Sequence, residues 1–202
     1  MNSANVTLAN HLWPTTTMNW TRAILLAICG SLVVAGAAQV SVPMYPVPMT
    51  LQTLAVLGIG AAYGARLGAA TLLLYAIEGL VGLPFFAGGQ AGIFQDGVII
   101  SSGGYIIGFI IAAALVGWLA EKGWSASPLK MILAALLGGV ALYVPGLIWL
   151  AVWAANVKGI DPSSAFQAAV SWGFAPFVLG DAIKAIVAGL GVSSALIASP
   201  RP

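Results

Sequence analysis

The stretch LKMILAALLGGVALYVPGLIWLAVWAA, residues 129–155, decides the class of fold, because Lys130 is its only charged residue. A helix needs about 20 consecutive, mostly apolar residues to cross the hydrocarbon core of a bilayer. Residues 129–155 exceed that length and therefore predict a transmembrane helix. Pro145 lies within the run and lacks the N–H that a helix interior uses, so a kink is predicted there.

The composition of the whole chain agrees with this stretch. Of 202 residues, 60% are hydrophobic and 6% are charged, and the mean hydropathy is +1.02. Soluble proteins carry about 25% charged residues, so lipid must surround most of this chain. At about 20 residues per span, the length holds about six or seven membrane helices and leaves no room for a soluble catalytic domain. The net charge of +2 is too small to indicate a nucleic-acid partner.

Cysteine and histidine each occur once, as Cys29 and His11. One cysteine excludes an internal disulfide and a cysteine-based metal cluster. The histidine lies in a polar leader, so neither a histidine metal site nor a Ser/His dyad is expected within the membrane. No metal site is predicted.

Other apolar runs flank residues 129–155. They cover about residues 23–42, 51–65, 67–82, 105–120 and 176–198. The run 51–65 is short for a span and is predicted to be tilted or partly re-entrant, and residues 163–175 are predicted to form a short interfacial helix. Residues 1–20 are predicted to be a cytoplasmic or interfacial leader. The predicted fold is an all-α membrane protein, a six-transmembrane-helix bundle in a single domain of residues 21–202.

The orientation of such a bundle follows from the side on which lysine and arginine gather, which is the cytoplasmic side. With six spans, one side of the membrane holds Arg22, Arg66, Lys122, Lys130 and Arg201. The other side holds only Lys158. Both termini are therefore predicted to be cytoplasmic, and the proline-rich loop 43–50 and the glycine-rich loop 83–104 to face outward.

Asp181 and Lys184 stand three positions apart in the apolar segment FVLGDAIKAIVAG, residues 177–189. Positions i and i+3 share one face of a helix, and Lys184 is about 25 Å of helix away from Arg201. This places both charges in the outer part of the hydrocarbon core, where an ionised side chain costs roughly 2.5–3.5 kcal/mol. One interpretation is an ion pair that neutralises itself. The preferred hypothesis is a site for a polar ligand, because two apolar residues would cost less than the pair.

The loop 83–104, LPFFAGGQAGIFQDGVIISSGG, carries further candidate ligand contacts. Glycines such as Gly104 let a backbone approach a ligand closely. Phe86 and Tyr105, which follows the loop, could cover an apolar ligand body, and Gln90 could exchange hydrogen bonds with an amide-like group. The alternative interpretation is an ordinary surface loop rich in turn residues.

Three polar residues lie near or within the second and third apolar runs. Gln52 is polar at membrane depth and is a candidate ligand contact, whereas Thr50 is predicted to cap the helix that follows it. Glu78 either lines a cavity or serves a helix contact, and the sequence does not choose between these roles.

Ala23 and Ala27 form a small-xxx-small pattern in the first apolar run. In lipid, such spacing lets two helices pack closely. Packing within the bundle is the default interpretation of this pattern in an alanine-rich chain.

Four stretches in this order resemble the signature segments of one family. They are VPMYPVPMTLQTLAVLGIGAAYGARLG (42–68), GLPFFAGG (82–89), GGYIIGF (103–109) and PFVLGDAIKA (176–185). The family is BioY, the biotin-specific substrate-capture subunits (S components) of energy-coupling factor transporters. The resemblance covers about residues 20–195. It departs from the family at ISSGGY, residues 100–105, where the family commonly has GPTGGY, which puts loop contacts near Ser101 and Ser102 in doubt.

The resemblance implies a six-helix S-component fold with an outward-facing biotin pocket and no enzymatic activity. It implies a partner module made of a transmembrane coupling subunit and two ATP-binding subunits, with docking on an AxxxA pattern that Ala23 and Ala27 match. No cofactor is expected, and ATP is expected only on the partner subunits.

In this interpretation Asp181 accepts from the ureido N–H groups of biotin. Lys184 pairs with Asp181 or with the biotin carboxylate. Phe86 and Tyr105 wall the thioether ring, while Gln52 and Gln90 are secondary polar contacts.

Two rival functions are considered. A stand-alone biotin carrier would have the same pocket but would need no ATPase partner. An intramembrane enzyme would need clustered aspartates for Mg²⁺, or a Ser/His or Asp/Asp pair. Asp181 is the only acidic residue predicted in the last three spans, so the sequence disfavours an enzyme.

Overall fold

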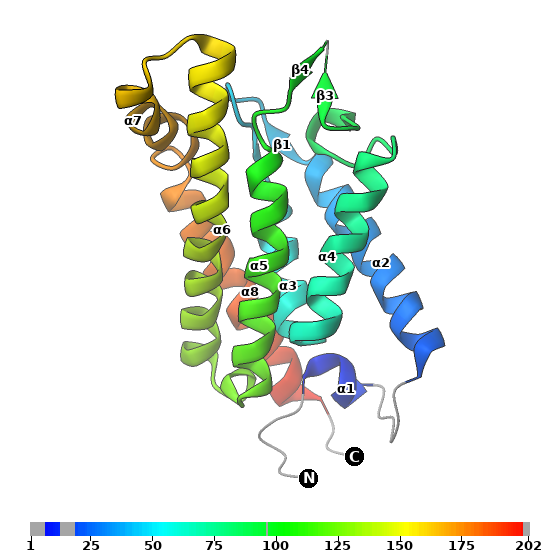
Figure 1. Ribbon diagram of the computed structural model, residues 1–202. Helices are drawn as coiled ribbons and strands as arrows, with labels where there is room; N and C mark the ends of the chain where they lie inside the picture. The colour runs from blue at the N-terminus through cyan, green and yellow to red at the C-terminus, as the bar shows by residue number, and fades with distance from the viewer. Residues whose placement is uncertain (1–6, 13–18, 96, 200–202) are drawn as a thin grey trace.

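The computed structural model describes residues 7–12, 19–95 and 97–199, which form eight α-helices and two small β-hairpins (Figure 1). The helices are α1 (Leu8–Leu12), α2 (Trp20–Gln39), α3 (Gln52–Tyr63), α4 (Ala65–Leu80), α5 (Gly103–Glu121), α6 (Pro128–Lys158), α7 (Pro162–Gly173) and α8 (Val178–Ala198). The hairpins pair β1 (Ser41–Val42) with β2 (Met49–Thr50), and β3 (Phe94–Gln95) with β4 (Val98–Ile99), both antiparallel. Two short 3-10 turns, η2 (Ala87–Gly89) and η3 (Trp124–Ala126), complete the structure.

All six predicted apolar runs are helical, and α7 is the predicted short helix before the last run. Their ends differ by a few residues from the prediction. The first run ends its helix at Gln39 rather than residue 42, because Ser41–Val42 pair with Met49–Thr50 in a hairpin. Apolar character does not distinguish a helix from a strand over so short a segment. α6 continues as a helix through Pro145 over 31 residues.

Four helices, α2, α5, α6 and α8, are long and apolar enough to cross a membrane within the described part of the chain. The prediction of six transmembrane helices, with the run 51–65 short for a span, is therefore confirmed only in part. α3 has 12 residues and α4 has 16. At 1.5 Å per residue they measure about 18 and 24 Å, against a hydrocarbon core of about 30 Å. The two short helices meet in a tight turn at Gly64, whose φ of +85° suits a glycine.

α5 is the central helix of the bundle. It packs against α3, α4 and α6, while α8 packs against α3 and α6, and α2 lies at the edge against α4. In Figure 1, α1, the α5–α6 turn and the end of α8 lie at one end of the bundle, and the β-hairpins and the α6–α7 connection lie at the other. We call these the α1 end and the hairpin end.

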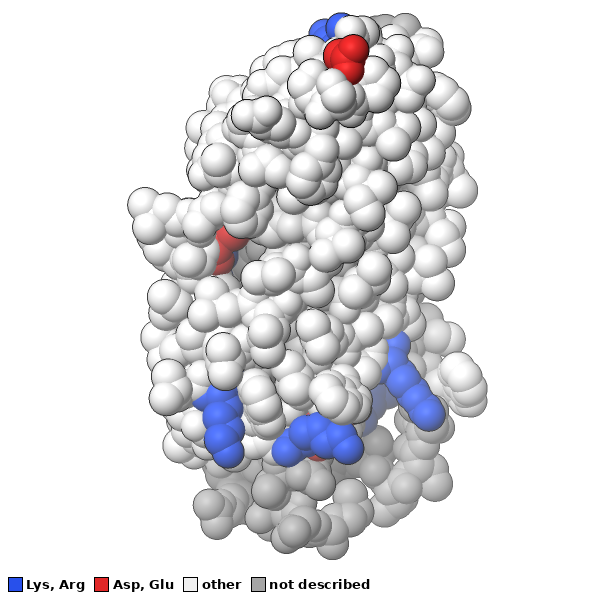
Figure 2. Space-filling model, turned by 60° about the vertical axis from the view of Figure 1, so that its left-hand side comes forward, with Lys and Arg blue, Asp and Glu red and all other residues white. Residues whose placement is uncertain are grey.

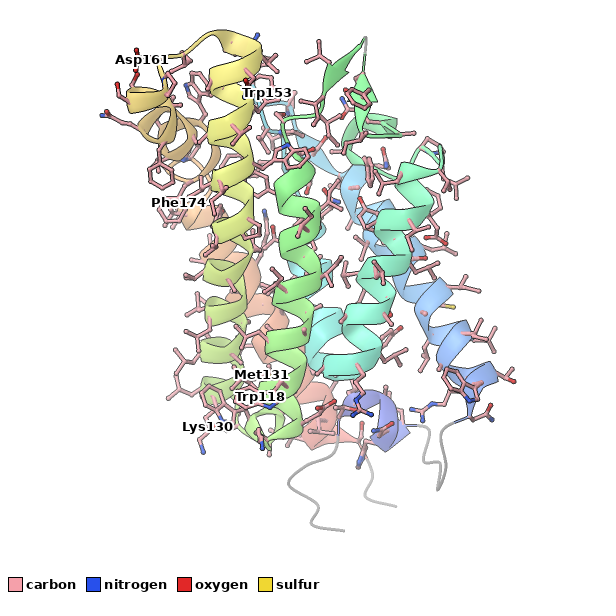
Figure 3. The ribbon with its side chains drawn as sticks, in the orientation of Figure 1. Trp118, Lys130, Met131, Trp153, Asp161 and Phe174 are labelled. Atoms are coloured by element: carbon pink, nitrogen blue, oxygen red, sulfur yellow. The ribbon has the colours of Figure 1, made fainter. Side chains whose placement is uncertain are left out.

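Basic side chains are distributed unevenly between these ends. Figure 2 shows lysine and arginine side chains gathered toward the α1 end on the face in view. Lys130 lies there, and Asp161 marks the hairpin end in Figure 3. Lys158, the last residue of α6, lies near Asp161 in the chain, with its Nζ 5.0 Å from the ring centre of Tyr45.

A carboxylate from α5 caps the first turn of α4. Oε1 of Glu121 accepts a hydrogen bond from the amide of Ala65 at 2.9 Å, and Gly64 at the N-cap has no side chain to offer. Glu121→Ala is expected to lower the stability of the protein by about 1 kcal/mol, the usual effect of losing a helix cap. Thermal unfolding in detergent measures this. Glu121→Gln keeps an acceptor oxygen and should unfold closer to the unaltered protein, and an unchanged unfolding temperature for Glu121→Ala would contradict the capping role.

Candidate ligand-binding pocket

A cavity opens near the hairpin end of the bundle, with about 560 Å³ of empty space including its mouth. The lining residues come from the proline loop, η2 and all of the helices α3, α4, α5, α6 and α8. They are Val47, Pro48, Thr50, Gln52, Thr53, Tyr75, Phe86, Ala87, Ser102, Tyr105, Ile106, Phe109, Leu142, Tyr143, Phe177, Asp181 and Lys184.

The short helix α3 creates the space for this cavity. Its first residues, Gln52 and Thr53, line the cavity, and the chain before them folds over as a loop instead of continuing the helix. Pro46 and Pro48 keep this loop out of helical conformation, since each lacks the N–H that a helix interior requires. The loop returns Val47 and Thr50 to the cavity wall.

Asp181 and Lys184 form the predicted ion pair, and both line the cavity. Nζ of Lys184 lies 2.8 Å from Oδ1 of Asp181, and the two side chains are 11% and 10% exposed. The other carboxylate oxygen, Oδ2, accepts a hydrogen bond from the hydroxyl of Tyr143 on α6. The pair therefore neutralises itself and also faces a cavity, and a ligand at this pair stays a prediction.

Gln52 belongs to a second polar cluster in the cavity wall. Its Nε2 donates to the hydroxyl of Tyr75 at 2.7 Å, and its Oε1 accepts from Thr50 at 3.0 Å. The Tyr75 hydroxyl in turn donates to the carbonyl of Phe85 at 3.2 Å. Thr50 also accepts from the amide of Gln52, but the N-cap of α3 is Leu51, so Thr50 lies one residue before the predicted N-cap position. One N–H of the Gln52 amide remains for a ligand in this arrangement.

The two aromatic residues predicted as apolar contacts, Phe86 and Tyr105, are among the apolar residues of the cavity wall. Phe86 is 2% exposed and lies edge-on to Tyr75 at 5.7 Å. Its ring occupies the space where a Cβ on Gly79 would stand. Tyr105 donates its hydroxyl to the carbonyl of Gly173 at 2.8 Å, so its ring is fixed against the wall.

Side chains from two helices, α2 and α6, tie the glycine-rich loop 83–104 to the bundle, and a serine joins that loop to the proline-rich loop. Nε2 of Gln39 donates to the carbonyl of Phe86 at 3.2 Å. The indole N–H groups of Trp149 and Trp153 donate to the carbonyls of Ile100 and Ile99, both at 2.8 Å. In the segment that departs from the family pattern, Oγ of Ser101 donates to the carbonyl of Pro46 at 2.6 Å, joining one loop to the other.

Two predicted contacts, Gln90 and Gly104, are not among the residues that line the cavity. Gln90 is exposed, and its carbonyl accepts from the amide of Phe86 at 2.9 Å. A Cβ on Gly104 would stand 2.3 Å from the carbonyl oxygen of Pro145, so this glycine allows α5 to approach α6 rather than a ligand. The interpretation of these two as cavity contacts does not agree with the structure.

The remaining candidates lie away from the cavity. Glu78 does not line it, and Oε2 of Glu78 is buried without a hydrogen-bond partner in the described part of the chain. Ala23 and Ala27 are half-buried on α2, and the residues that follow each of them, Ile24 and Ile28, are exposed. Asp96 and Arg201 lie outside the described residues.

Sequence reasoning missed Tyr143 and Tyr75, which hold Asp181 and Gln52. Both are hydroxyl-bearing residues inside apolar runs, and a buried tyrosine hydroxyl usually finds a hydrogen-bond partner. That rule is the signal that could have found them. The partner could not be named without knowing which helices are neighbours.

The cavity has the features of a small-molecule pocket with one ion pair in its wall. Comparisons with known proteins assign the chain to a family. The sequence model of the BioY family matches residues 5–201. The chain belongs to the BioY family. "Biotin transporter BioY" of Rhizobium etli is 32% identical over 188 residues, covering 88% of this chain and 94% of that protein. "Probable biotin transporter BioY" of Pyrococcus horikoshii is 35% identical over 164 residues, covering 81% and 89%.

A solved structure shares the fold of this BioY chain. It is the crystal structure of the S-component for biotin from an ECF-type ABC transporter, with a TM-score of 0.72. The match covers 92% of this chain and 97% of that one at 21% sequence identity. The family assignment and the four long apolar helices make the chain a multi-pass membrane protein, of a family whose curated relatives are biotin transporters.

Proposed function

We propose that this protein captures biotin with high affinity for uptake across the cytoplasmic membrane, as the substrate-binding component of an energy-coupling factor transporter. The observation that carries the proposal is the Asp181–Lys184 ion pair in the wall of a cavity, in a chain of the BioY family. The relatives in this family are described as biotin transporters.

The cavity offers groups that complement each part of biotin. The ureido ring presents two N–H donors and a carbonyl acceptor. Asp181 is an acceptor and Lys184 a donor, 2.8 Å apart, so the pair matches the donor and acceptor atoms at one edge of that ring. Phe86 and Tyr105 supply apolar contact for the thioether ring, and the free N–H of Gln52 supplies one further donor.

Lys184 contacts the ureido carbonyl in this proposal, rather than the biotin carboxylate. Its Nζ is held beside Asp181 and has two further N–H donors. A carboxylate placed against Lys184 would also lie close to Asp181, and two like charges at such a distance repel each other.

The proposed arrangement in the membrane is a six-helix bundle with both termini on the cytoplasmic side. The basic side chains at the α1 end support that orientation, since lysine and arginine gather on the cytoplasmic side of membrane proteins. The short helices α3 and α4 complete the bundle without each crossing the full core. The cavity near the hairpin end would then open outward, where it meets external biotin.

The proposed partners are a transmembrane coupling subunit and two ATP-binding subunits, with docking on α2 around Ala23 and Ala27. Exposed apolar side chains beside them, such as Ile24 and Ile28, would add contact area. The alternative is a stand-alone carrier with the same pocket. The fold similarity to an S-component favours the first function.

Two measurements test the proposal. Detergent-purified protein is expected to bind biotin, as judged by titration calorimetry, and Lys184→Ala to bind it at least about tenfold more weakly. Cells that contain only this protein should accumulate labelled biotin slowly, and co-expression of an ATPase module should accelerate uptake. An absence of biotin binding would contradict the proposed function, and full uptake without a module would support the stand-alone carrier.

A further inference from the structure

We propose that Tyr143 is a positioning residue of the pocket, which orients the Asp181 carboxylate and makes the site selective for ligands with N–H donors. The proposal rests on the proposed biotin function. It concerns a residue of α6 that acts on a ligand through Asp181 of α8.

The first support is the pattern of hydrogen bonds at Asp181. A carboxylate has two oxygens with about four lone-pair positions. Tyr143 donates to Oδ2 and Lys184 donates to Oδ1. Each oxygen therefore keeps one acceptor position, and the two donors together fix the rotation of the carboxylate plane. Lys184 alone would not fix that plane, because it comes from the same helix and contacts a single oxygen.

The second support is the rigidity of Tyr143 itself, whose ring is 7% exposed. It packs edge-on against Phe174 at 4.9 Å and against Tyr105 at 6.0 Å. Tyr105 is fixed in turn by its hydrogen bond to Gly173 and by close contact with Gly146. A donor that cannot move sets the position of its acceptor, and preorganised groups bind ligands at lower entropic cost.

This arrangement makes the pocket select ligands by the hydrogen-bond donors that they carry. With Tyr143 and Lys184 supplying the donors inside the protein, the carboxylate can accept further hydrogen bonds but cannot donate one. A ligand that presents an N–H beside a carbonyl, as one edge of the ureido ring does, donates to an acceptor position that the two protein donors leave free. A ligand whose nitrogens are methylated leaves a desolvated carboxylate unsatisfied, and sites built to hydrogen-bond a substrate reject such analogues strongly.

Tyr143→Phe removes the hydroxyl and keeps the ring, so it tests the proposal directly. Biotin and a biotin analogue with methylated ureido nitrogens are titrated against the unaltered chain and the variant. Biotin affinity is expected to fall about tenfold, the scale of one hydrogen bond to a charged group, while the affinity for the analogue stays unchanged. The ratio between the two ligands therefore falls about tenfold, which a merely structural role of Tyr143 would not produce.

Two control experiments show whether the effect of Tyr143→Phe depends on the pocket and on Asp181. Tyr63→Phe removes a hydroxyl from a tyrosine of α3 that does not line the cavity, and should leave the ratio unchanged. In an Asp181→Asn background, Tyr143→Phe should change biotin affinity less than twofold, because the two residues act as a unit. Equal loss of both ligands, or biotin binding as tight as in the unaltered chain, would overturn the role of Tyr143. Failure of the unaltered chain to bind biotin would instead overturn the proposed function.

Discussion

Asp181→Asn is expected to weaken biotin binding by at least about 100-fold, or about 2.7 kcal/mol. The substitution removes the charge that holds Lys184 and replaces one acceptor oxygen with a donor. Lys184 then lies in a largely buried wall without its counter-ion, and removing one partner of such a pair commonly costs 2–5 kcal/mol. Titration calorimetry of the purified protein measures the effect.

The same substitution at Asp161 is the matched control. Asp161 caps α7 at the hairpin end, where it accepts from the amide and the hydroxyl of Ser163. These hydrogen bonds, led by the one from the hydroxyl, hold the pKa of Asp161 below its ordinary value. Asparagine caps helices about as well as aspartate, so Asp161→Asn should bind biotin normally.

Replacing both members of the pair separates a ligand role from a purely structural one. Apolar replacement of both partners of a buried ion pair often leaves stability unchanged or improves it. Asp181→Leu combined with Lys184→Met should therefore fold, with only the loss of stability that follows from removing the acceptor of the Tyr143 hydroxyl, but fail to bind biotin. If this double variant bound biotin as tightly as the unaltered chain, the pair would be a structural ion pair and no part of the site.

The charged residues of the site could be predicted from the sequence because of where they stand. Aspartate and lysine are costly in an apolar helix, so the position of Asp181 and Lys184 alone indicates a specific role for them. The helices were predicted for a related reason, since only long apolar runs satisfy the requirements of a bilayer. Phe86, Tyr105 and Gln52 line the cavity with them, and their role as ligand contacts remains a prediction.

The rest of the site depends on which helices are neighbours. Tyr143 is an ordinary residue of an apolar run until α6 is placed against α8. Gln90 and Gly104 were misplaced for a similar reason. In a sequence, a glycine that lets a ligand come close cannot be told from a glycine that lets a neighbouring helix come close. The position of α6 shows that Gly104 lets α6 come close to α5.

Gly108→Ala is expected to destabilise the protein by about 3 kcal/mol, the upper range for overpacking a tight contact. A Cβ at this position of α5 would stand 2.4 Å from the carbonyl oxygen of Leu142 and 2.9 Å from its Cα. Both atoms belong to the backbone of α6, so no side-chain movement relieves the clash and the helices must separate. The unfolding temperature should fall by about 10 °C for a chain of this size.

Biotin binding should weaken together with stability in Gly108→Ala, because α5 carries Tyr105 and α6 carries Tyr143. Gly139→Ala is the control on α6. No described atom lies within 4 Å of a Cβ added there, and alanine favours a helix over glycine by about 0.5–1 kcal/mol. Gly139→Ala should therefore unfold at an equal or higher temperature than the unaltered chain. If Gly108→Ala and Gly139→Ala unfolded at the same temperature, the proposed role of the close α5–α6 contact in positioning Tyr105 and Tyr143 would be contradicted.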